Sequence, residues 1–207
     1  MLGIQKILPV YLPLERRFDP ALEELEGVVM VGPEPDTGRP AIVVRWEVDY
    51  VELGDFVSLK GARVIPWAFF LREEDGERRW ALFGAVEVRL PGRRDLTLDR
   101  YFTCREKPSE TMGKTFRLQT NALSNAVEEA LEPFGVLQDL TPEGLEVVFI
   151  PHKDTEVFFF DRDIVVDHYI VYPVAFLRRQ QEHLLLVEVL YDDGEEGPET
   201  VEYVTLN

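Results

Sequence analysis

The chain has 207 residues, of which 45% are hydrophobic and 29% are charged, so its composition is typical of a globular protein rather than a disordered one. Its formal charge of −17 argues against binding to nucleic acid or to anionic membranes, because both depend on basic side chains. No apolar run reaches the roughly 18 residues of a membrane helix, and the N-terminus has no signal-peptide pattern, so we expect a cytoplasmic protein.

The first half of the chain predicts one helix among several strands. Asp19 is a good N-cap, Pro20 fits the first helical position and Gly27 fits the end, so we expect the helix between them. Alternating or β-branched apolar segments predict strands at residues 7–12, 41–51, 64–72 and 80–90. The last two of these strands form a predicted hairpin across a charged turn.

The second half predicts the same order of elements. A strand at residues 114–119 is followed by a helix over residues 121–132, which Pro133 and Gly135 end. Further strands are predicted at residues 145–150, 156–160, 164–178, 184–191 and 200–206. The segments 164–178 and 184–191 form a second predicted hairpin.

Short matches between the two halves indicate an internal duplication. Three pairs of segments match in the same order along the chain: ALEE at 21–24 with AVEE at 126–129, VIPWAF at 64–69 with VYPVAF at 171–176, and VEV at 86–88 with VEV at 187–189. Ordered matches at similar separations arise by chance less often than isolated ones.

We therefore predict an α+β fold, a mostly antiparallel β-sheet with two main helices, in which a β-α-β-β-β unit occurs twice. Residues 1–104 are the first predicted repeat and residues 105–207 the second, packed together as one compact domain. Pro66 and Pro173 lie at the same place in the two repeats. Because proline has no N–H to donate to a sheet, each position requires an edge strand or a β-bulge.

The second half is much more acidic than the first. Residues 1–104 carry 18 acidic and 14 basic side chains (net −4), whereas residues 105–207 carry 21 and 8 (net −13). The acidic half could dock a basic partner, although solubility alone also explains such a charge. Two corresponding turns after the hairpins have opposite charges and could join subunits head to tail. The candidate partner-binding residues at these turns are Arg93, Arg94, Asp192, Asp193, Glu195 and Glu196.

One acidic segment is a candidate metal site. If residues 161–167 are extended, Asp161, Asp163 and Asp167 share one face of the strand and His168 lies on the other. Three neighbouring carboxylates repel one another unless a cation lies among them, which favours an ion such as Mg²⁺ or Ca²⁺. The spacing matches no established metal motif, so a solvated turn is the alternative. No motif in the chain requires a cofactor.

Our leading functional prediction is a non-catalytic, acidic binding or assembly module that docks a protein partner or associates with itself. Two alternatives remain open. A metal-dependent hydrolase or transferase would use the Asp161–Asp167 cluster with His152 or His168. A small-molecule-binding domain would use the abundant aromatic side chains as a pocket between the two repeats, although such side chains also pack ordinary cores.

Overall fold

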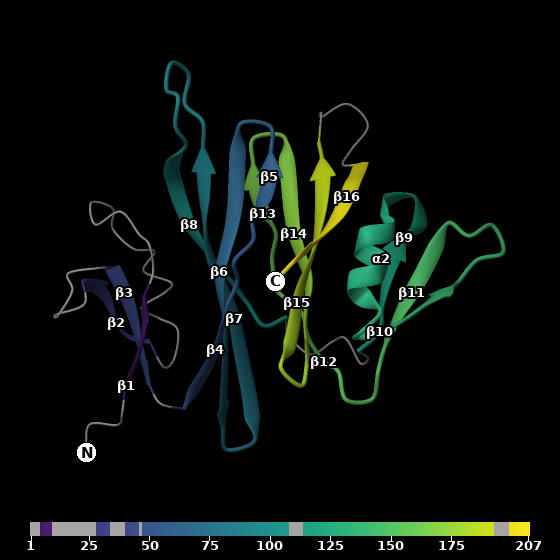
Figure 1. Ribbon diagram of the computed structural model, residues 1–207, viewed down its shortest axis with the longest axis horizontal. Coiled ribbons are helices and arrows are strands. Elements are labelled where there is room, and N and C mark those ends of the chain that lie inside the picture. Colours follow the sequence, from purple (N-terminus) through teal and green to yellow (C-terminus); the bar gives the residue numbers. More distant parts are fainter. Residues whose placement is uncertain (1–4, 10–27, 34–39, 46, 108–113, 193–198) are drawn as a thin grey trace. The chain divides into compact units, whose positions relative to one another are not determined.

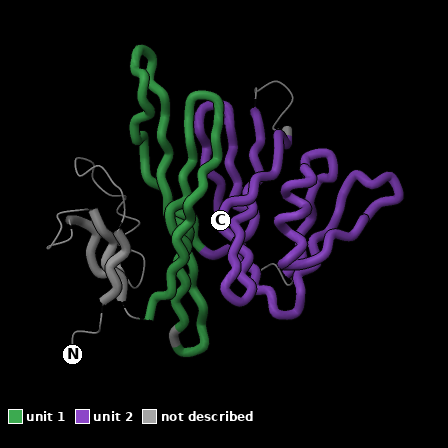
Figure 2. Tube along the Cα trace, viewed as in Figure 1, with its two compact units in different colours: residues 1–105 green, residues 106–207 purple. Residues whose placement is uncertain are grey.

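The computed structural model describes residues 5–9, 28–33, 40–45, 47–107, 114–192 and 199–207. The chain divides into two compact units, residues 1–105 and 106–207 (Figure 2). Each unit contains a three-stranded and a five-stranded antiparallel sheet. The predicted helix that begins after Asp19 lies outside the described residues.

The strands of the first unit are β1 (Gln5–Pro9), β2 (Val28–Pro33), β3 (Pro40–Arg45), β4 (Val48–Glu52), β5 (Val57–Leu59), β6 (Ala62–Glu74), β7 (Glu77–Val88) and β8 (Thr97–Arg105). Strands β1, β3 and β2 form the small sheet in that order. The larger sheet has the order β4-β6-β7-β8, and β5 also pairs with β6 (Figure 1).

The second unit begins with β9 (Phe116–Gln119), a 3₁₀ turn η1 (Thr120–Ala122) and the helix α2 (Asn125–Leu131). The strands that follow are β10 (Gly135–Asp139), β11 (Glu146–Pro151), β12 (Glu156–Phe158), β13 (Ile164–Val166), β14 (Tyr169–Arg179), β15 (Glu182–Tyr191) and β16 (Glu199–Leu206). The small sheet has the order β10-β11-β9, and the larger one has the order β12-β14-β15-β16 with β13 also paired to β14.

The two units have the same strand order. In each small sheet the third strand of the unit lies between the first and the second. In each larger sheet a long hairpin is bordered on one side by two short strands and on the other by a single strand. This correspondence supports the proposal of an internal duplication, and it extends over more strands than the β-α-β-β-β unit that the sequence predicts.

Pro66 and Pro173 lie in the middle of their sheets, next to β-bulges. The register of β6 against β7 shifts between Pro66 and Ala68, and that of β14 against β15 shifts between Pro173 and Ala175. On the other side of each long strand, one short partner ends before the proline and the next begins after it. The predicted bulge is confirmed and the edge alternative is wrong, because a proline is accommodated where the ladder is interrupted on both sides.

The predicted α+β class with two main helices is wrong. Among the described residues only one α-helix occurs, the seven-residue α2, and the chain is mostly antiparallel β-sheet. The helix begins later than expected because Ser124 is its N-cap, whose side-chain oxygen accepts a hydrogen bond from the Val127 N–H at 3.4 Å. Within the same described ranges, no helix is long and apolar enough to cross a membrane.

The core of the second unit lies between its small sheet, with α2, and one face of its larger sheet. Val127 and Leu131 are the buried residues of α2. They pack in a cluster with side chains from both sheets, among them Leu118, Phe149 and Leu186. Burial of this apolar surface therefore holds the two sheets of the unit together.

Gly135 begins β10 and allows the close approach of β11. A Cβ atom at this position would overlap both the Ile150 carbonyl oxygen and the buried ring of Phe149. The sequence suggested only that Gly135 ends a helix, and it gave no indication of β10. The glycine is instead required by the packing of a strand against its neighbour.

We expect Gly135→Ala to lower the free energy of unfolding by about 1–3 kcal/mol, because the added methyl group forces backbone and ring to move. Urea denaturation of the full chain measures this change. Gln138→Ala, in an exposed position of the same strand, is the matched control and should change stability by less than about 0.5 kcal/mol. Equal effects of the two substitutions would contradict the packing role of Gly135.

The end of the β14–β15 hairpin holds a partly buried histidine. His183 lies opposite Arg178 in the ladder and stacks on the Phe176 ring with 6.0 Å between ring centroids. Burial lowers the pKa of His183 below its ordinary value. The neighbouring Arg178 forms an ion pair with Glu156, with 2.7 Å between Nε and Oε2. The folded chain therefore favours the neutral imidazole.

This lowered pKa predicts a pH-dependent loss of stability. Between the folded pKa and the unfolded value of about 6.5, the unfolded chain binds a proton that the folded chain does not. The contribution of His183 is therefore complete above this window and falls as the pH is lowered through it. Thermal denaturation between pH 7.5 and pH 5.5 should show a smaller acid-induced loss for His183→Gln than for the wild type. Parallel pH profiles would contradict the prediction.

Candidate functional site

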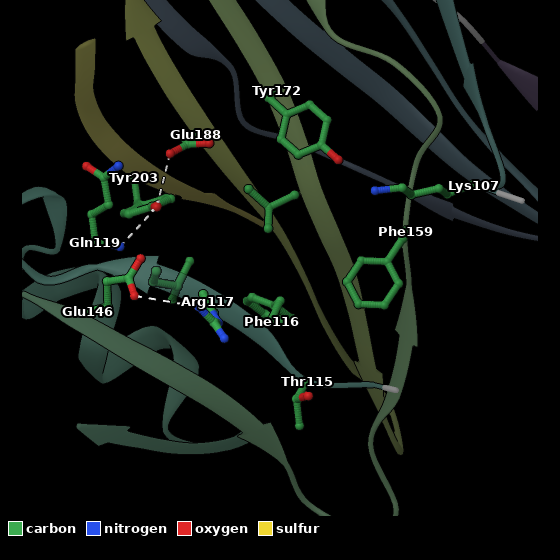
Figure 3. Close-up of a pocket in the computed structure, with 12 residues that line it drawn as sticks. Lys107, Thr115, Phe116, Arg117, Gln119, Glu146, Phe159, Tyr172, Glu188 and Tyr203 are labelled. Carbon is green, nitrogen blue, oxygen red and sulfur yellow. Dashed lines mark hydrogen bonds and ion pairs between the residues drawn. The ribbon is translucent and has the colours of Figure 1, made fainter. Parts of the chain in front are cut away.

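A cleft of about 420 Å³ lies along β9 in the second unit (Figure 3). Five consecutive residues, 115 to 119, contribute to its wall. Because successive side chains of a strand point to opposite faces, a cleft on a face of a sheet would be lined by every second residue. A wall of consecutive residues means that the cleft follows the edge of β9, where its backbone is accessible.

Within the described residues β9 pairs only with β11, which places it at the edge of its sheet. The other side faces the larger sheet of the unit, which contributes Tyr172 and Val174 from β14, Glu188 from β15 and Tyr203 from β16. The small sheet and the larger sheet thus form the two walls of the cleft.

Tyr203 connects these two walls. The Gln119 N–H donates a hydrogen bond to the Tyr203 hydroxyl oxygen at 3.2 Å, and the hydroxyl donates to Glu188 Oε1 at 3.0 Å. The Thr200 hydroxyl donates to the same carboxylate oxygen at 3.3 Å. Tyr203 is only 5% exposed, so this bond pattern satisfies a buried polar group.

The Tyr203 hydroxyl remains protonated at neutral pH. Burial raises its pKa well above the ordinary value, and the negative charge of Glu188 raises it further. The hydroxyl can therefore serve as a donor to Glu188, but it is a poor proton donor or acceptor for catalysis near pH 7. Its bonds to Gln119 and Glu188 join the two walls at one end of the cleft, which we call the closed end, and this position indicates a structural role.

Aromatic rings form the apolar part of the cleft. Phe116 stacks on the buried Phe149 with 4.9 Å between ring centroids and meets Phe159 edge-on at 6.0 Å. The ring of Tyr172 lies across the cleft from Phe159, with its hydroxyl directed toward the Lys107 side chain (Figure 3). Such a surface favours a ligand that has an apolar or planar group.

Charged side chains lie at the rim of the cleft. Arg117 and Glu146 form an exposed ion pair with 3.8 Å between Nη1 and Oε2. Lys107 is held beside the cleft because its N–H donates a backbone hydrogen bond to the Phe159 carbonyl at 3.0 Å. Arg117 is already paired with Glu146, so Lys107 is the basic group best placed to bind an anionic group of a ligand.

The predicted metal residues lie on exposed segments around β13. Asp161 and Asp163 precede this strand, and Asp167 and His168 form the turn that follows it. His168 Nε2 lies 3.7 Å from Asp167 Oδ1. Across the described residues, which include His152, no three His, Cys, Asp or Glu side chains lie close enough together to hold a metal ion. Asp167 has a positive φ of 54°, as a tight turn requires.

The predicted partner-binding residues are only partly described. Arg93 and Arg94 are exposed in the turn after β7, where Gly92 has a φ of 79°. Asp192 follows β15, and its N–H donates to the His168 carbonyl at 2.8 Å. Asp193, Glu195 and Glu196 lie outside the described residues. The head-to-tail contact remains a prediction.

Sequence reasoning did not find the cleft along β9. It predicted the strand itself, at residues 114–119, but not that one edge of the strand would face the larger sheet. The aromatic pocket was expected between the two repeats, whereas this cleft lies within the second unit. Its residues come from distant parts of that unit, and the aromatic content was the only signal in the sequence.

Comparison with known proteins gives no assignment for this chain. No protein-family model matches the sequence, and no curated protein or solved structure matches it.

We expect Tyr203→Phe to lower the free energy of unfolding by about 1–3 kcal/mol, because the substitution leaves the Gln119 N–H without its acceptor and removes one of the two donors to Glu188. Urea denaturation measures this loss. Tyr191→Phe, which removes a hydroxyl from a 42% exposed residue, is the control and should have an effect below about 0.5 kcal/mol. An unchanged stability in Tyr203→Phe would show that the hydroxyl does not hold the sheets together.

Proposed function

We propose that this protein is a non-catalytic binding module and that the cleft along β9 holds its ligand. The observation that carries the proposal is the combination, in one cleft, of an accessible strand edge, the aromatic rings of Phe116, Phe159 and Tyr172, and the basic side chain of Lys107. These features favour a ligand that has both an apolar part and an anionic group.

The chemistry of the lining supports binding rather than reaction. The Tyr203 hydroxyl accepts a hydrogen bond from Gln119 and donates one to Glu188, and Arg117 is paired with Glu146. A group that acts as an acid, base or nucleophile must instead reach the ligand in a reactive protonation state. The side chains of this cleft can position a ligand through contacts and charge alone.

Binding of the dye 8-anilinonaphthalene-1-sulfonate tests the proposal, because this dye carries an aromatic part and an anionic group. We expect its fluorescence to rise on addition of the full-length protein. Lys107→Glu should weaken dye binding roughly fivefold, the equivalent of about 1 kcal/mol, because it places a negative charge beside the sulfonate.

The matched control is Lys60→Glu, which makes the same charge change at an exposed residue of the first unit. It should leave the dissociation constant within about twofold, since long-range effects of a surface charge are largely screened by salt. Absence of dye binding, or equal weakening by both substitutions, would overturn the proposal. Native mass spectrometry of the same samples reports whether the protein binds the dye as a monomer or as an oligomer.

A further inference from the structure

We propose that the cleft binds an extended peptide segment of a partner protein, which adds as a further strand to the edge of β9 that faces the cleft and places an acidic side chain near Lys107. This inference rests on the proposed function and names the ligand of the same cleft. It follows from the direction of the β9 backbone groups, from the closed end of the cleft and from its charges.

The direction of the backbone groups follows from one hydrogen bond. The Gln119 N–H points away from β11, because it donates to the Tyr203 hydroxyl. In an antiparallel ladder both backbone groups of a residue point to the same side, and they alternate sides along the strand. The N–H and C=O of Arg117, two residues earlier, therefore also point away from β11 and into the cleft. Those of Phe116 and Leu118 point toward β11.

This arrangement suits a peptide better than a compact small molecule. Backbone groups that recur every second residue are about 7 Å apart along a strand, which is the repeat of another extended chain. A peptide laid along β9 can exchange both backbone hydrogen bonds with Arg117. Strand addition of this kind obtains affinity from main-chain bonds and selectivity from pockets for alternate side chains.

Tyr203 and the aromatic rings limit what the peptide can be. The Tyr203 hydroxyl occupies the edge at Gln119, so the added strand must end before this position. Its side chains alternate between the inner wall, with Phe159 and Tyr172, and the rim, with Arg117. Apolar side chains suit the inner wall.

Lys107 favours an acidic side chain of the peptide at one end of the cleft, whereas the net charge of this half of the chain alone predicts a basic partner. Glu146 already pairs with Arg117, and Glu188 accepts hydrogen bonds from Tyr203 and Thr200. Lys107 can therefore receive a carboxylate of the peptide, at the end of the cleft toward which the Tyr172 hydroxyl points (Figure 3). We accordingly expect alternating apolar residues with a glutamate or aspartate among them.

The test is selection of a displayed library of random nine-residue peptides on the full-length protein, followed by affinity measurements with the enriched peptides. Arg117→Pro removes the N–H that points into the cleft and leaves the bonds of Phe116 and Leu118 to β11 unaffected. It should weaken binding at least about tenfold, as expected for loss of main-chain bonds in a cleft. Arg117→Ala, which keeps the N–H, is the matched control and should weaken binding by less than about threefold.

Hydrogen exchange provides a second measurement that does not depend on the folding of the proline variant. In the wild-type protein an enriched peptide should slow exchange of the Arg117 amide, whereas the Leu118 amide is already protected by β11. The inference is overturned if no alternating peptide is enriched, if both Arg117 variants bind equally, or if Arg117 exchange does not change.

The outcomes separate this inference from the proposed function. If dye binding still depends on Lys107 but the peptide criteria fail, the cleft binds ligands and strand addition is wrong. If dye binding fails as well, the cleft is not a binding site. Formation of a dimer by the wild type, abolished by Arg117→Pro but not by Arg117→Ala, would identify a second copy of this chain as the occupant and would overturn the proposal of a different partner.

Discussion

The hydroxyl group of Tyr203 is the contact on which the arrangement of the second unit depends. It accepts a hydrogen bond from the backbone of β9 and donates one to Glu188 on the larger sheet. Apolar packing draws the two sheets together without fixing their separation, because the hydrophobic effect has no direction. The hydrogen bonds of Tyr203 have a direction, and they hold the edge of β9 against the larger sheet at one end. The cleft follows the rest of this edge, so the same contact that orders the core also bounds the candidate binding site.

The corresponding place in the first unit has different chemistry. Tyr101 of β8 lies opposite Ala85, at the ladder position that Tyr203 occupies opposite Glu188. Trp67, at the bulge after Pro66, packs near Tyr101 with 5.7 Å between ring centroids, whereas the second unit has Val174 at its bulge. Trp67 of the first unit thus corresponds to the smaller Val174 of the second, and Ala85 corresponds to the carboxylate of Glu188. If the units are products of a duplication, they have diverged at the place where the second one has its cleft.

The sequence predicted local elements better than the contacts between them. Both long hairpins followed from the apolar pattern, and Pro66 and Pro173 required either a bulge or an edge position, because strand period and proline chemistry act within a few residues. The α+β assignment was wrong because the described residues are mostly antiparallel β-sheet. The helix before Pro133 was predicted too long, since Ser124 caps its N-terminus. Strand β10 was not predicted, because Gly135 also suits the end of a helix. The repeated Val-Glu-Val segments are offset by two residues in the ladders, where Val86 faces Val64 but Val189 faces Val171. The cleft could not be predicted, since only the folded chain brings β9 and Tyr203 together.

The bulge beside each central proline has a consequence for the order of folding. A hairpin whose register is fixed by a proline and an extra residue cannot slide to another pairing, so each long hairpin can form correctly from contacts close in sequence. The bond between Gln119 and Tyr203 closes a much longer loop, because its partners are 84 positions apart in the sequence, and its entropic cost is correspondingly higher. The hairpins should therefore be formed early and the cleft late. The walls of the cleft would then be among the first parts to separate in local opening, which would let a strand enter along β9 while the hairpins remain intact.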